Sequence, residues 1–133
     1  MAQENIADKL ANQFYTRDPF VLAKALNRIV IETPLVGVRG YYQRIKKSHI
    51  IYVDSGLNEF DRQFVCAHEL GHSVLHPQLN AIFMDSCTHF KKAKYEIEAD
   101  RFAIDLLIPC ERYADYFCMS APDIADALGG GTP

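Results

Sequence analysis

Residues 64–75 read FVCAHELGHSVL and predict a continuous helix that carries a His-Glu-x-x-His motif. Successive residues of a helix turn by about 100°, so His68 and His72 point in nearly the same direction and can bind one metal ion. Glu69 lies one step round the helix, where its carboxylate can reach a water at the metal without occupying a coordination position. The motif therefore indicates a water-activating zinc site, with Glu69 as the catalytic base.

A catalytic zinc site of this kind needs a third protein ligand. One class of zinc peptidase takes a histidine six residues after the second motif histidine, with a glycine between them. This chain has Gln78 and Leu75 at those positions, so that class is excluded. The other common solution is a glutamate from a second helix, which the pattern of apolar residues predicts over residues 91–108.

Two glutamates of the helix over residues 91–108 are possible ligands. Glu96 continues the apolar face of that helix by one turn, whereas Glu98 points toward its polar side. We therefore predict Glu96 as the third ligand and keep Glu98 as the alternative. Asp100 follows Glu96 by one helical turn, so it can accept the second ring N–H of a motif histidine and fix its tautomer.

The bulk composition is that of an ordinary globular protein, with 133 residues, 49% of them hydrophobic and 23% charged. We expect one domain over residues 1–133, with its core at about 15–110 and a short helical segment at 111–133. The formal charge of -3 gives no general attraction for nucleic acid, and we expect no direct nucleic-acid partner. The basic run around Lys46 and Lys47 is interpreted as a solvated hairpin turn.

Two further features concern the location of the protein. The first residues lack the basic start and apolar stretch of a secretion signal, and no apolar segment reaches the length of a membrane span. We therefore expect a cytoplasmic protein without a membrane partner. Because no Cys-x-x-Cys pair is present, the four cysteines are expected to be free thiols: Cys66, Cys87, Cys110 and Cys118.

The remaining pattern predicts an α+β fold that is mainly helical. A helix is expected over residues 3–16, and a second begins with Asp18 as N-cap and Pro19 at the first helical position, its buried face extending to Ile29. Residues 35–53 alternate in the manner of an antiparallel hairpin or meander. Asn58 is the expected N-cap of the motif helix.

Together, HELGH at residues 68–72 and EIEADRFAIDLLIP at 96–109 resemble the ImmA/IrrE family of zinc metallopeptidases, and the resemblance covers about residues 15–110. It implies a small zincin-like domain in which a short antiparallel or mixed sheet packs on the motif helix. It also implies that His68, His72 and Glu96 bind one Zn²⁺ per chain, with Glu69 as the base. The substrate class that it implies is cytosolic helix-turn-helix repressors of phages and mobile elements.

Three residues are weaker candidates for stabilising the oxyanion or binding substrate: Tyr52, His76 and His89. His76 continues the stripe of the motif histidines, but its place beside Pro77 favours a solvent-facing histidine at the helix end.

The alternative to a peptidase is an anti-repressor that acts by binding alone, on the same scaffold and with a structural or vestigial metal site.

Overall fold

The computed structural model describes residues 4–78 and 89–108, which form four helices and a three-stranded sheet. In chain order the elements are α1 (Ile6–Phe14), α2 (Pro19–Ala25), β1 (Arg28–Thr33), β2 (Gly40–Ile45), β3 (Ser48–Asp54), α3 (Glu59–Leu75) and α5 (His89–Leu107). The predicted α+β class is confirmed. Within the described ranges, no helix combines the length and apolar character needed to cross a membrane. The C-terminal helical segment predicted at 111–133 lies outside them.

The sheet is mixed and has the strand order β1-β3-β2. β1 runs parallel to β3, while β2 and β3 form the predicted antiparallel hairpin. Lys46 and Lys47 form its exposed turn, where Lys46 adopts a left-handed conformation with φ of 55°. Because the central strand alternates, the buried Ile51 and Val53 face the helices and Tyr52 faces the other way.

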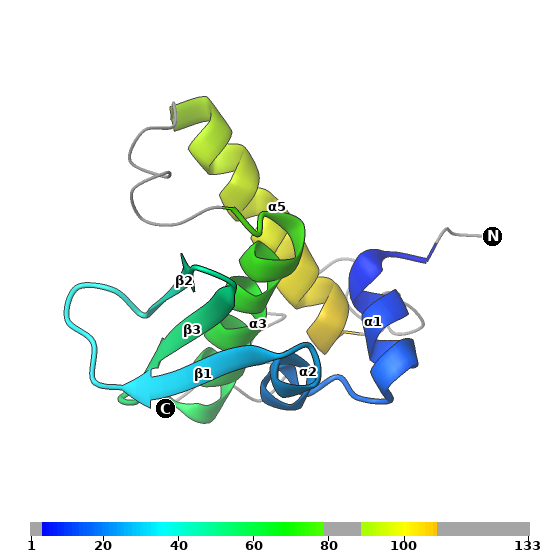
Figure 1. Cartoon of the computed structure of the whole chain (residues 1–133), viewed down its shortest axis with the longest axis horizontal. Coiled ribbons are helices and arrows are strands. Elements are labelled where there is room, and N and C mark those ends of the chain that lie inside the picture. The colour runs from blue at the N-terminus through cyan, green and yellow to red at the C-terminus, as the bar shows by residue number, and fades with distance from the viewer. Residues whose placement is uncertain (1–3, 79–88, 109–133) are drawn as a thin grey trace, which may run out of the picture.

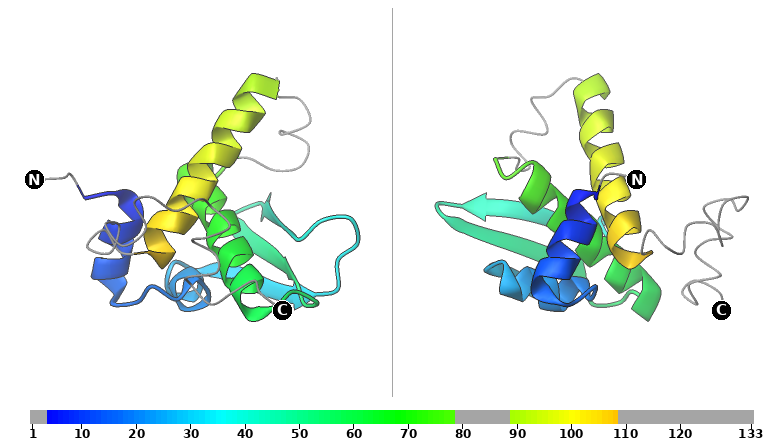
Figure 2. Two further views of the ribbon diagram at one scale, coloured as in Figure 1. Left: turned by 180° about the vertical axis from the view of Figure 1, so that it is seen from behind. Right: turned by 90° about the vertical axis from the view of Figure 1, so that its right-hand side faces the viewer.

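The helices pack on one face of this sheet, with α3 against β2 and β3, and α2 against β1 (Figure 1). α5 crosses α3, and its first turns extend beyond the body of the molecule, as Figure 2 shows from two further directions. The core lies between α3, α5 and the sheet, and its largest fully buried side chains include Phe102, Leu22, Ile51, Leu70 and Leu106. This crossing places the motif helix beside the acidic residues of α5.

The predicted N-caps of α2 and α3 are confirmed, whereas α1 begins at Ile6 instead of residue 3 and α5 at His89 instead of residue 91. Asp18 caps α2 by accepting the backbone N–H of Phe20, and Asn58 caps α3 by accepting that of Asp61. The predicted end of the second helix is wrong, because α2 stops at Ala25 and Ile29 belongs to β1. The β-branched run Ile29, Val30, Ile31 favours an extended backbone.

We expect Phe102→Ala to lower the free energy of unfolding by about 3–5 kcal/mol, because it leaves a cavity between α5 and α3. Phe102 is 2% exposed and packs in the main core cluster. Urea denaturation followed by circular dichroism measures the change. Phe90→Ala on the same helix is the matched control: Phe90 is 83% exposed, so that change should stay within about 0.5 kcal/mol. Equal losses in the two variants would contradict this account of the core.

Candidate metal centre

The two motif histidines lie side by side on α3. The rings of His68 and His72 meet edge to face with centroids 4.8 Å apart. Both side chains are largely buried, with exposed fractions of 13% and 8%. Helical periodicity therefore brings two imidazoles to one place, as the sequence predicts.

Glu96 of α5 completes a group of three metal-binding side chains. Its two carboxylate oxygens each lie 3.0 Å from a ring Nε2, one from that of His68 and the other from that of His72. The three ligand atoms lie within 4.8 Å of one another. Zinc bonds of about 2.0–2.2 Å keep the ligand atoms of one ion within about 4 Å of one another, so these residues fit the ion with small side-chain movements.

The approach of the two helices depends on Gly71, which lies next to His72. A Cβ atom at Gly71 would lie 3.1 Å from both Cβ and Cδ1 of Phe102, closer than side chains usually pack. The absence of a side chain at Gly71 therefore allows α5 to lie against α3. This contact positions the N-terminal half of α5, including Glu96, over the histidine pair.

The charges of the centre stabilise one another. Burial lowers the pKa of His68, but the hydrogen bond to Glu96 and the nearby carboxylates of Glu69, Glu96 and Asp100 outweigh burial and raise that pKa to about 9. Hydrogen bonds from His68 and His72 hold the pKa of Glu96 well below its usual range. The carboxylate of Glu96 is therefore ionised at neutral pH, which is the form that binds a cation.

Asp100 lies behind His68, one helical turn after Glu96. Its Oδ1 is 2.8 Å from His68 Nδ1, so it can accept the proton of that nitrogen. With a metal bound, His68 Nε2 would then offer its lone pair to the ion in place of the hydrogen bond to Glu96. Of the two motif histidines, it is thus His68 that Asp100 contacts.

Glu69 stands beside the ligand group and faces a pocket. Its side chain is buried, and its Oε2 lies 3.9 Å from His68 Nε2. Desolvation raises the pKa of Glu69, against a smaller opposing effect of His68 and His72. A carboxylate with a raised pKa can both accept and return a proton near neutral pH.

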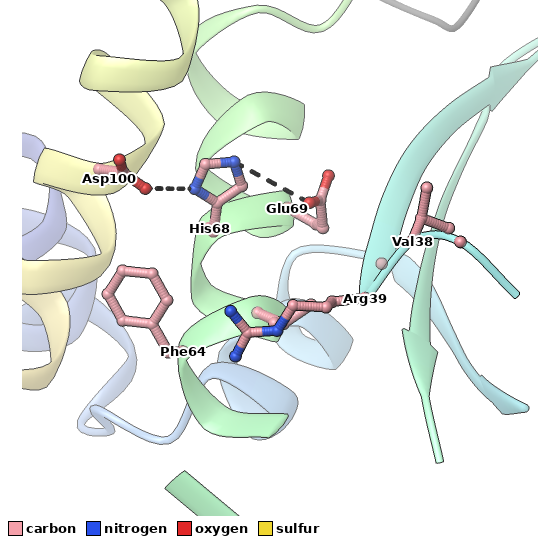
Figure 3. Close-up of a pocket in the computed structure, with 9 residues that line it drawn as sticks. Val38, Arg39, Phe64, His68, Glu69 and Asp100 are labelled. Carbon is pink, nitrogen blue, oxygen red and sulfur yellow. Dashed lines mark hydrogen bonds and ion pairs between the residues drawn. The ribbon is translucent and has the colours of Figure 1, made fainter. Parts of the chain in front are cut away.

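The pocket beside Glu69 has a volume of about 430 Å³ and lies between α3 and the start of β2 (Figure 3). His68, Glu69 and Asp100 line it together with wall residues from two other segments, namely Phe64, Val65 and residues 37–40. These wall residues are not among the site residues predicted from the sequence. Phe64 had a usable signal, because it precedes His68 by one helical turn; residues 37–40 had none.

The alternative ligand Glu98 does not join the histidine pair. Its Oε1 lies 3.3 Å from Nε2 of His76, whose Nδ1 is in turn 3.3 Å from Nδ1 of His72. The expectation of a solvent-facing His76 is wrong: its side chain is only 8% exposed, because α5 covers it. His76 does end the helix, since its backbone N–H donates to His72 O.

Of the other two weak candidates, Tyr52 is not brought to the centre. Tyr52 lies in the central strand on the face away from α3, where its ring stacks on Tyr41 at 4.4 Å and its hydroxyl donates to Gln43. This position removes Tyr52 from the candidates for oxyanion stabilisation. His89 begins α5, but its side chain lies outside the described residues.

Cys66 is the cysteine that lies within the described residues, and it is not part of the metal-binding group. Cys66 is free and buried in α3, and burial raises the pKa of its thiol. This agrees with the expected free thiol at that position. Cys87, Cys110 and Cys118 lie outside the described residues.

Comparison with known proteins gives a family and two relatives. The profile of peptidase family M78, described as the IrrE N-terminal-like domain, matches residues 23–128. The chain is 42% identical over 102 residues to the uncharacterized immunity region protein 2 of Bacillus phage phi105, a match covering 76% of the chain and 65% of that protein. It is 33% identical over 81 residues to the metallopeptidase ImmA of Bacillus subtilis strain 168, covering 59% of the chain and 47% of that protein. The match spans less than two thirds of the length of either relative.

The family profile covers most of the chain, and the helices and mixed sheet agree with a zincin-like fold. The chain therefore belongs to the M78 peptidase family.

Proposed function

We propose that this protein is a zinc-dependent endopeptidase. The observation that carries the proposal is the joint position of His68, His72 and Glu96, with ligand atoms within 4.8 Å of one another, next to the buried Glu69. Two imidazoles and one carboxylate form a donor set that is common in catalytic zinc sites. Membership of a metallopeptidase family supports the same assignment.

In this proposal each residue has a separate task. Zinc, when bound, supplies a Lewis acid that polarises the scissile carbonyl and acidifies a water molecule. Glu69 accepts the proton of the attacking water and then delivers it to the leaving amine. Burial favours this exchange, because it raises the pKa of Glu69 toward neutral pH. Asp100 holds the ring of His68 in the tautomer that binds metal through Nε2.

The proposed substrate is a cytosolic regulatory protein, namely a helix-turn-helix repressor of a phage or mobile element. The name of the phage phi105 relative, an immunity region protein, supports this context, as does the similarity to the metallopeptidase ImmA. The pocket beside Glu69 has room for side chains of an extended segment. We propose a cytoplasmic location and no direct binding of nucleic acid.

The proposal is tested by incubating the zinc-loaded protein with the repressor encoded beside its gene and measuring intact masses. We expect two fragments whose masses add up to that of the repressor plus one water, which identifies a single hydrolysed bond. Chelation of the metal should stop the cut, and returning zinc should restore it. Stable binding of intact repressor that is insensitive to chelation would favour the anti-repressor alternative instead.

A further inference from the structure

Each motif histidine points one ring nitrogen toward Glu96, and its other ring nitrogen contacts a second residue. For His68 that partner is the Asp100 carboxylate, 2.8 Å from Nδ1. For His72 the partner at Nδ1 is another imidazole, that of His76 at 3.3 Å. An imidazole, unlike a carboxylate, can either donate or accept at that nitrogen, so its own protonation pattern must be fixed by something else.

The carboxylate of Glu98 fixes the protonation pattern of His76. The Oε1 atom of Glu98 lies 3.3 Å from Nε2 of His76. An ionised carboxylate only accepts hydrogen bonds, so His76 must carry its proton on Nε2 to make this contact. In neutral His76 the Nδ1 atom then has a free lone pair and can accept from Nδ1–H of His72. When zinc is bound, it would replace the hydrogen bond between His72 Nε2 and Glu96. The relay would then hold the proton of His72 on Nδ1 and leave the Nε2 lone pair for the metal.

We infer that His76 and Glu98 form a relay that positions His72 for metal binding, equivalent to the direct action of Asp100 on His68. The relay rests on the proposed zinc centre and assigns roles to two residues that do not themselves bind the metal. His76 and Glu98 are positioning residues: Glu98 fixes the tautomer of His76, and His76 fixes that of His72. Second partners of this kind commonly change metal affinity by about 10–100-fold.

The surroundings of His76 favour this role over simple capping of the helix. The cap of α3 is made by the backbone N–H of His76, which any residue except proline could provide. The ring instead turns toward α5, where it lies 4.7 Å from the ring of Tyr95 and is largely buried. A buried imidazole needs partners for both nitrogens, and the two contacts of the relay provide them.

The test compares substitutions that remove or retain each acceptor. His76→Phe keeps a ring beside Tyr95 but has no acceptor for His72, so we expect zinc affinity to fall by about 10–100-fold. His76→Asn places an amide oxygen near the position of Nδ1 and should recover most of that affinity. Glu98→Gln removes the charge but keeps an acceptor, and should weaken zinc less than Glu98→Ala. Affinity is measured by competition with a chromophoric chelator.

A second readout follows the protons themselves. Long-range ¹H–¹⁵N spectra of the zinc-loaded wild type should show His72 with Nδ1–H, and His76 as the Nε2–H tautomer. In metal-free Glu98→Ala the share of the Nε2–H form of His76 should fall relative to the metal-free wild type, because Glu98 no longer accepts from that nitrogen. A His76 nitrogen bound to zinc, a dominant Nδ1–H form of His76 in the wild type, or unchanged zinc affinity in His76→Phe would each overturn the relay.

These measurements separate the relay from the proposed function. Zinc affinity and tautomers are read without any substrate, so the relay can hold even if no repressor is cut. Conversely, cleavage of the repressor together with unchanged zinc affinity in His76→Phe would overturn only the relay. Circular dichroism melts of the metal-free variants identify any general loss of folding.

Discussion

Glu69→Gln should lose cleavage of the repressor by about 10²–10⁴-fold while it still binds zinc. Glutamine has nearly the same shape as glutamate, but its amide cannot take a proton from water at neutral pH. Glu69 is not one of the three residues whose ligand atoms converge, so the metal-binding group is unchanged. The loss should therefore appear in kcat, with zinc content close to one ion per chain.

The comparison requires a matched variant with the same chemical change. Glu59→Gln serves this purpose, because Glu59 lies in the first turn of the same helix and its side chain is 73% exposed. Its rate of cleavage should equal that of the wild type. Repressor cleavage that persists in Glu69→Gln would refute the proposed base. Release of repression by both variants without any cut would point to the anti-repressor alternative.

The sequence predicts the helices better than the strands, and the reason is local. Caps such as Asp18 and Asn58 act over three residues, so they can be recognised from the sequence, and both are found at helix starts. β1 was missed because Leu26 and Ile29 have the three-residue spacing of a helix face. Its pairing with β3, more than 20 residues later, is a long-range contact that no local pattern reveals.

The same distinction applies to the site. Helical periodicity is enough to place His68 and His72 together and to turn Glu96 toward the core, and the structure brings these three side chains into one group. The position of Tyr52 depends on which face of the sheet the helices cover, and that is decided by tertiary packing. The pocket wall from residues 37–40 likewise arises from the packing of β2 on α3, where a Cβ atom at Gly40 would lie only 2.5 Å from Val65 Cγ1.

Glu96→Ala should remove zinc binding more completely than any change outside the three predicted ligands. The substitution leaves two imidazoles without the carboxylate that approaches both of them at 3.0 Å. We expect zinc affinity to fall by more than about 100-fold, the upper end of the loss caused by removing an outer partner. Glu98→Ala should retain zinc with a weaker affinity, because Glu98 contacts His76 rather than the ligand group.

Thermal unfolding with and without zinc provides the measurement for Glu96. Zinc that binds only the folded wild type at about 1,000 times its Kd adds about 4 kcal/mol to the free energy of unfolding, which raises Tm. Glu96→Ala should show little of this rise at the same zinc concentration, whereas Glu59→Ala should show all of it. Metal analysis after gel filtration gives the stoichiometry independently. The assignment of the third ligand would be reversed if zinc raised the Tm of Glu96→Ala fully and did not raise that of Glu98→Ala. The residue whose removal abolishes zinc binding must be the one that holds the ion.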